Sequence, residues 1–204
     1  MKSNNDIKII AAFIITILIL VLFYFGAYLP LRKSQIHINA VLNLQNGKVR
    51  TLDDMNNLFN SVLNFYSPVG QDETTQYYLG ILLNIINQQS NKDVIDVLAR
   101  QAENQMEPIL KAGKGFNFNQ NLYTLGSIYK ITALKSRDLG YYQKAVNIFN
   151  NGLKYSPNRL IFLMGLFDIY SANTDDKEKA LETGKTILKY YPNEKRVEEY
   201  LMGK

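Results

Sequence analysis

The sequence predicts an all-α protein: one N-terminal transmembrane helix, then an α-solenoid of about four helix pairs with a C-terminal capping helix. First, residues 9–31 contain no charged side chain. Second, apolar residues recur at helical spacing throughout the rest of the chain. Third, two units that each run from Ala to Pro, residues 145–157 and 180–192, lie thirty-five residues apart. A fixed period of about 34 residues indicates an array of helix-turn-helix units.

The composition excludes several classes of function. Apolar residues make up 47% of the 204-residue chain, enough for a packed core, and there is no Cys. Disulfides, thiolate metal sites and thiol nucleophiles are therefore excluded. The net charge is +5, but the basic residues are scattered among acids, and the longest basic run is Arg32-Lys33. A nucleic-acid footprint would be clustered, so we predict no nucleic-acid partner.

Residues 1–8 form a short polar tail, and residues 9–31 are predicted to be a transmembrane anchor in the lipid bilayer. Twenty-odd apolar residues at 1.5 Å per residue match a hydrocarbon core of about 30 Å. Tyr24, Tyr28 and Pro30 mark the far end of the span. A buried core helix and a cleaved signal peptide are the alternatives. The apolar run is long and no Ala-x-Ala site follows it, which favours an uncleaved anchor.

The orientation of this span is nearly balanced by charge. Lys2 and Lys8 flank one side, and Arg32 and Lys33 flank the other. A short tail ahead of a single span usually stays in the cytoplasm. We therefore expect a single-pass membrane protein whose repeat domain is extracytoplasmic.

Residues 32–115 are predicted to form two degenerate helix pairs. The first consists of a helix over 35–45 and a second helix that begins after Thr51, a good N-cap, and stops near residue 66. The second pair covers residues 72–89 and 93–111. We expect Pro108 to bend or end its helix near Glu107.

Residues 116–204 carry the clearer repeats and a cap. The turn at 173–176, Asn-Thr-Asp-Asp, has the chemistry of a helix N-cap. A short charged segment, 194–202, is typical of the capping helix that a solenoid needs. The other helices of this region are predicted at residues 120–137, 142–154, 160–172 and 177–190.

These residues resemble the tetratricopeptide repeat (TPR) family. The positions that match the family pattern in the first unit are Leu125, Gly126, Tyr129, Gly140, Ala145, Phe149, Gly152 and Pro157, and those in the second are Leu166, Tyr170, Ala180 and Pro192. Small residues at 145 and 180 allow helices to approach closely, and the ring of Phe149 is expected to fill the space between neighbouring pairs. Gly184 stands where the pattern has an aromatic residue, and Phe167 stands where it has glycine.

Residues 55–200 also resemble the C-terminal, TPR-like tail of bacterial O-antigen ligase and polymerase-type membrane proteins. The segments that carry this resemblance are NLFNSVLNFYSPVGQDE, NLYTLGSIY and FNNGLKYSPNR. The resemblance implies a membrane-tethered repeat domain at the cell envelope, associated with surface glycan assembly. It transfers no catalytic residue, because the multi-span part of those enzymes has no counterpart here. The alternative is an accessory or detached C-terminal part of such an enzyme, working with a multi-span membrane protein.

Few residues could carry chemistry of their own. His37 is the single histidine and has no metal-ligand neighbour in the sequence. The acid pairs Asp53-Asp54 and Asp175-Asp176 both stand at helix starts, where capping explains them better than catalysis or calcium binding. We therefore predict no catalytic residue, no cofactor and no metal, and a protein that is not an enzyme.

The resemblance to the TPR family implies a groove lined by the first helix of each pair, and this groove is where a protein partner is expected to bind. An ordinary solvated helix face is the alternative. The candidate partner-binding residues are Gln120, Tyr123, Ser127, Lys130, Met164 and Asp168. We expect the chain to be a membrane-anchored TPR scaffold for protein–protein interaction.

Overall fold

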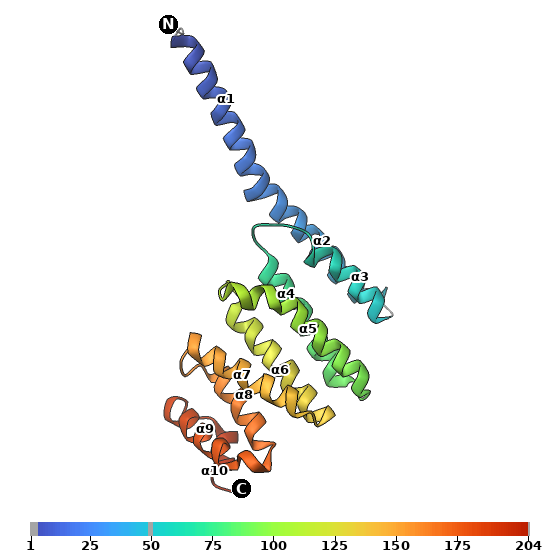
Figure 1. Cartoon of the computed structure of the whole chain (residues 1–204), viewed down its shortest axis with the longest axis vertical. Coiled ribbons are helices and arrows are strands. Elements are labelled where there is room, and N and C mark those ends of the chain that lie inside the picture. The colour runs from blue at the N-terminus through green and yellow to red at the C-terminus, as the bar shows by residue number, and fades with distance from the viewer. Residues whose placement is uncertain (1–3, 49–50, 204) are drawn as a thin grey trace. The chain divides into compact units, whose positions relative to one another are not determined.

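The protein is all-α, as predicted. The computed structural model describes residues 4–48 and 51–203, and these contain helices, turns and loops but no β-strand (Figure 1). Residues 1–3 of the predicted polar tail lie outside the described residues. The chain divides into two compact units, Met1–Thr74 and Thr75–Lys204.

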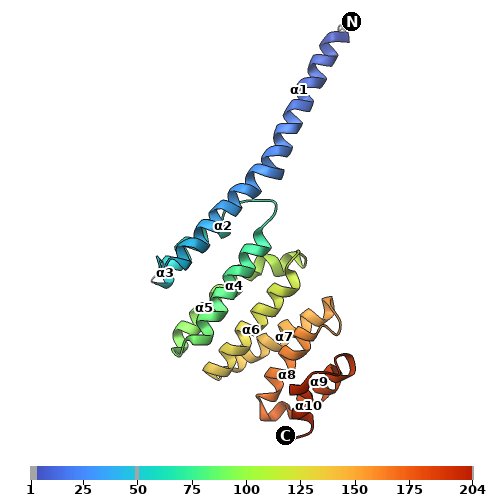
Figure 2. The same ribbon diagram turned by 180° about the vertical axis from the view of Figure 1, so that it is seen from behind.

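The first unit is built on one unbroken helical rod. It consists of α1 (Asn4–Phe23), a π-helical turn η1 (Tyr24–Tyr28) and α2 (Leu29–Gln45), as Figures 1 and 2 both show. The apolar part is long enough to cross a membrane, and the side chains of its candidate window are not buried. We expected a new helix to begin at residue 35. The structure instead continues the anchor helix directly to Gln45.

Pro30 explains the π-turn. Proline has no backbone N–H, and its ring conflicts with the carbonyl four residues earlier, which here belongs to Gly26. In η1 the N–H of Leu29 reaches back five residues to the carbonyl of Tyr24. A local i→i+5 turn of this kind re-spaces the hydrogen bonds of a helix. The rod therefore passes through Pro30 without a break.

Helix α3 (Leu52–Leu63) packs on α2 within the first unit. Its predicted cap is confirmed: the Thr51 hydroxyl accepts from the N–H of Asp54 at 3.0 Å, and the Asp54 carboxylate accepts from the N–H of Thr51 at 3.1 Å. This reciprocal capping box satisfies two donors at the helix start. Met55, Phe59 and Val62 form its buried face.

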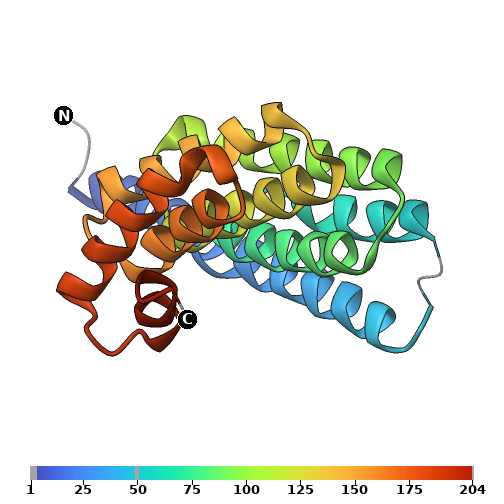
Figure 3. The same cartoon turned by 90° about the horizontal axis from the view of Figure 1, so that it is seen from below.

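The second unit consists of helices that pack in chain order. α6 contacts α5 and α7, α8 contacts α7 and α9, and α10 contacts α9 (Figure 1 and, from below, Figure 3). α6 also contacts α8, two helices further along the chain. The bounds, with most of α4 in this unit, are α4 Gln71–Gln88, α5 Lys92–Ala112, α6 Phe118–Ser136, α7 Leu139–Tyr155, α8 Leu160–Ser171, η2 (a 3₁₀ turn) Thr174–Asp176, α9 Lys177–Tyr190 and α10 Lys195–Leu201.

The expectation that Pro108 ends or bends its helix near Glu107 is wrong about the end. α5 continues to Ala112, with Pro108 inside it. Met106 and Ile109, on either side of Pro108, are 0% and 5% exposed. Burial of these two side chains holds the backbone helical through the proline, so packing overrides the local preference.

Aromatic rings packed against glycines form the core between the helices. Phe149 of α7 is fully buried, and a Cβ placed on Gly126 of α6 or on Gly165 of α8 would lie 2.5 Å or 2.6 Å from its ring. The ring therefore occupies the space that both glycines leave, as expected for the space between pairs. Ala145 and Ala180 are also fully buried, as predicted.

The two residues that depart from the repeat pattern compensate for each other. A Cβ on Gly184 of α9 would lie 3.2 Å from Val197 of α10, and 3.3 Å from both Leu201 of α10 and the ring of Phe167 on α8. Side chains of α8 and α10 thus occupy the space beside Gly184. They keep the volume between the helices filled.

Candidate partner-binding face

Three helices of the second unit meet at the carboxylate of Asp168. Lys130 of α6 donates to Asp168 Oδ2 at 2.6 Å, and Arg196 of α10 donates to Asp168 Oδ1 at 2.5 Å. We call Lys130, Asp168 and Arg196 the charge triad. Two of its members were predicted from the sequence as partner-binding residues, and the structure brings those two together.

Close helix packing positions the charge triad. Because Gly126 and Gly165 both accommodate the ring of Phe149, α6 and α8 approach closely enough for Lys130 to reach Asp168. On α10, Val197 is buried in a cluster with Phe167, while the neighbouring Arg196 lies with its guanidinium 5.9 Å from the centre of the Phe167 ring. This cation–π contact and the ion pair together orient Arg196.

The other four predicted residues lie on the same helices but differ in exposure. Tyr123 is half-buried, with its ring centre 6.4 Å from that of Phe149, and Gln120 is half-buried one turn earlier. Met164 packs against the cluster that contains Phe167. Ser127 is buried, at 5% exposure, so its hydroxyl offers little surface to a partner.

Arg196 is the member of the charge triad that sequence reasoning missed. Its side chain is 59% exposed, against 16% for Lys130 and 25% for Asp168. The predicted capping segment, 194–202, included Arg196, but the candidate partner-binding residues all came from the two recognisable repeats. Arg196 lies on α10, which follows the two recognisable repeats, so repeat spacing did not indicate it. Its exposure leaves the guanidinium accessible for a partner's carboxylate, while Asp168 neutralises one of the two cations.

The predicted cap chemistry of the turn 173–176 is found at Asn173, whose side chain accepts from the N–H of Asp175 at 3.3 Å, whereas Asp176 has a different role. It stands before α9 but makes no side-chain capping bond there. Instead it accepts from Lys179 at 2.5 Å, from Asn173 at 2.8 Å and from the hydroxyl of Tyr142 on α7. The bonds from Lys179 and Tyr142 hold the pKa of this carboxyl below its usual value. Burial, followed by the bond to Asp176, raises the pKa of Tyr142. Asp176 therefore ties α7 to the start of α9.

A cavity of about 460 Å³ in the second unit is bordered by α5, α6 and α7, and an ion pair lies among its lining residues. Lys144 donates to both carboxylate oxygens of Glu103, at 2.8 and 2.9 Å. Its ammonium also lies 5.5 Å from the ring centre of Tyr129 and 5.4 Å from that of Tyr141. Burial is the main cause that raises the pKa of Tyr129. This arrangement clamps α5 to α7.

Among residues 4–48 and 51–203, no three His, Asp or Glu side chains are grouped so that they could hold a metal ion. His37 lies in the first unit, half-buried on α2. No protein-family model matches the chain, and neither a curated protein nor a solved structure matches it.

Proposed function

We propose that this chain is a membrane-anchored, non-enzymatic scaffold whose helical second unit binds a protein partner. The observation that carries the proposal is the continuous helix from Asn4 to Gln45. Its apolar part is exposed over the length of a bilayer, and its C-terminal part, α2, packs against α3 within the first unit. A hydrocarbon surface of that size needs a nonpolar environment, and a bilayer provides one.

The proposed architecture of the second unit is a short TPR-type α-solenoid. Support comes from the packing of successive helices and from the contact between α6 and α8, the first helices of consecutive pairs. The fit of Phe149 against Gly126 and Gly165 supports the same reading. In a solenoid, each repeat contacts its neighbours and the first helices line one face.

The proposed binding surface is the side of α6, α8 and α10 that carries the charge triad. Arg196 offers an exposed guanidinium, and Tyr123 offers a half-buried ring. Arginine and tyrosine are the residue types that most often dominate the energy of protein interfaces. An extended or helical peptide segment with a carboxylate would suit this surface.

The proposed setting is surface glycan assembly at a bacterial envelope, with the repeat unit outside the cytoplasm. This setting, and the alternative of a detached part of an O-antigen ligase or polymerase-type enzyme, rest on the sequence resemblance alone. Both stay predictions. A multi-span membrane protein is the partner that either setting implies.

Photo-crosslinking in native membranes tests the binding surface. A photoreactive phenylalanine analogue replaces Tyr123 in the full chain, and Gln143, exposed on α7, carries the same analogue as the control. We expect a discrete crosslinked product from position 123 and none from position 143. Arg196→Ala should reduce that product at least about fivefold, since a charged contact contributes about 1 kcal/mol or more.

The matched control for Arg196→Ala is Arg100→Ala, which removes another exposed arginine, on α5. It should leave the crosslink unchanged. Equal crosslinking from positions 123 and 143, or equal loss with either arginine variant, would contradict the assigned surface.

A further inference from the structure

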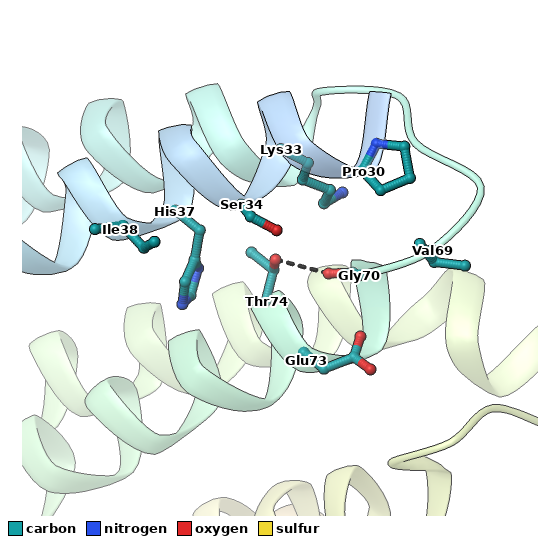
Figure 4. Close-up of a pocket in the computed structure, with 9 residues that line it drawn as sticks. All are labelled: Pro30, Lys33, Ser34, His37, Ile38, Val69, Gly70, Glu73 and Thr74. Atoms are coloured by element: carbon teal, nitrogen blue, oxygen red, sulfur yellow. Dashed lines mark hydrogen bonds between the residues drawn. The ribbon is translucent and has the colours of Figure 1, made fainter. Parts of the chain in front are cut away.

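The first unit contains a cavity that begins where the predicted membrane span ends. Its volume is about 450 Å³, within the range of small-ligand sites. Lys33, Ser34 and His37 of α2 line one side, and Glu73 and Thr74, in the first turns of α4, line the other. Figure 4 shows Ser34 and His37 projecting from α2 toward Thr74.

The unbroken helix fixes the depth of this cavity relative to the span. At a rise of 1.5 Å per residue, Lys33 lies about 3 Å beyond Leu31 and His37 about 9 Å beyond it. The polar headgroup region of a bilayer is about 5–8 Å thick on each side. Provided that the anchor is inserted as proposed above, the cavity opens at the level of the lipid headgroups.

Lys33 supplies the positive charge of the cavity; burial lowers its pKa from the ordinary value, and the nearby Glu73 acts in the opposite direction. Lys33 is 2% exposed, and its ammonium donates to the carbonyl of Phe65 at 3.1 Å and to Oε1 of Gln71 at 2.5 Å. An ammonium has three N–H donors, and these bonds use two of them. The aliphatic stem of Lys33 lies beside Gly70, whose φ of +88° suits glycine. The position of this charge is therefore determined by the fold.

The charge facing Lys33 across the cavity is negative. Glu73 is exposed at the start of α4, and its carboxylate interacts electrostatically with Lys33. His37 adds polar atoms without charge near pH 7, because burial and then the nearby Lys33 lower its pKa. The two fixed charges sum to zero, which matches a zwitterion better than an anion.

We propose that this cavity binds the headgroup of a phosphatidylethanolamine-type lipid. The lipid phosphate accepts from Lys33 and Ser34, and the primary ammonium donates to Glu73. A primary ammonium has N–H donors for a carboxylate. A quaternary ammonium has none and is usually held by aromatic rings, whereas the residues that line this cavity include no Phe, Tyr or Trp.

Native mass spectrometry of the full chain in lipid nanodiscs tests the proposal. The discs contain equal parts of phosphatidylethanolamine, phosphatidylcholine and phosphatidylglycerol. Phosphatidylethanolamine should remain bound to the released protein at least about fivefold more often than either other lipid. Glu73→Gln should abolish that preference. The matched control, Glu182→Gln, removes an exposed acid on α9 and should leave it intact.

Several outcomes would overturn the headgroup assignment. They are equal retention of the three lipids, a preference for phosphatidylglycerol, or a preference that survives Glu73→Gln.

Ser34→Val is a second variant that keeps all charges. It should weaken retention of phosphatidylethanolamine without raising retention of phosphatidylcholine. A further arm adds soluble phosphoethanolamine to discs made of phosphatidylcholine alone. If the protein retained it as often as it retains phosphatidylethanolamine, the acyl chains and the bilayer would contribute nothing to binding. A chain that fails to enter discs at all contradicts the anchor instead, so the two proposals fail in distinguishable ways.

Discussion

At the scale of single residues, the second unit depends on where rings and glycines face each other. Phe149 lies against Gly126 on one helix and against Gly165 on another, so one side chain sets the spacing of α6, α7 and α8. Phe162 has the same relation to Gly152, where an added Cβ would lie 2.3 Å from its ring. Fully buried rings have no free volume to move into. These glycines are therefore required for packing.

Gly126→Ala is expected to destabilise the protein by about 1–3 kcal/mol. The new methyl would overlap the buried ring of Phe149, and this cost outweighs the helix propensity gained. Gly80→Ala in α4 is the matched control, because a Cβ there meets no atom within 4 Å. It should stabilise by about 0.5–1 kcal/mol.

Denaturant unfolding of the full chain in a nonionic detergent measures both changes. Near-ultraviolet circular dichroism can follow the transition, since the chain has fourteen Tyr and no Trp. If Gly126→Ala and Gly80→Ala moved the midpoint in the same direction, Phe149 would not be confined as described.

Asp176 gives the stability a specific pH dependence. Bonds from Lys179 and Tyr142 lower its pKa in the folded state, whereas an unfolded Asp titrates near about 4. The unfolded chain therefore binds more protons near that pH. The contribution of Asp176 is present above about pH 4 and is lost as the pH falls through the folded-state pKa.

Asp176→Asn should accordingly cost about 1–2 kcal/mol at pH 7, and the cost should shrink as the pH is lowered below about 4. Asp175→Asn is the control, because that side chain is exposed in the same turn. Unfolding midpoints of the three proteins between pH 3 and about pH 7 provide the measurement. A cost for Asp176→Asn that stayed constant with pH would show that the carboxylate charge is not what Lys179 and Tyr142 recognise.

At the scale of helices, local sequence signals predicted where a helix begins better than they predicted whether a helix continues through a proline. Thr51 was identifiable as a cap because its hydroxyl needs only the donors of the next turn. Pro108 was misread because the side chains that hold α5 together across it, Met106 and Ile109, are fixed by neighbours distant in sequence. Pro30 was predicted to mark the far end of the span, and the structure adds that the helix continues past it through a π-turn.

Pro108→Ala should stabilise the protein by roughly 1–3 kcal/mol, because it restores an N–H donor in the interior of α5 and removes the ring from the preceding turn. Pro157→Ala, in the exposed turn after α7, should instead lower the free energy of unfolding by about 0.4–1 kcal/mol, because it raises the conformational entropy of the unfolded chain. Thermal unfolding of the two variants side by side distinguishes these effects. A loss of stability in Pro108→Ala would mean that α5 requires the proline.

At the scale of the whole molecule, the sequence predicted the all-α class, the long apolar helix and most helices to within a few residues. Hydrophobic spacing and an uncharged run are local properties, so they can be read without knowing which helices touch. The charge triad could be predicted only in part. Lys130 and Asp168 followed from repeat spacing, but Arg196 belongs to a helix outside the two recognisable repeats. Lys33 could not be predicted as buried, because its partners Phe65 and Gln71 come from a later loop and helix.

We propose that one span places the helical second unit on the other side of a membrane from the N-terminus. The chain has no Cys, so single substitutions at Asp6, Ile17 and Asn193 give uniquely placed thiols. A membrane-impermeant maleimide applied to intact spheroplasts is expected to label the thiol at 193. It should label the thiol at 6 only after permeabilisation, and the thiol at 17 in neither condition. Labelling of positions 6 and 193 from the same side, or free labelling of position 17, would contradict the account.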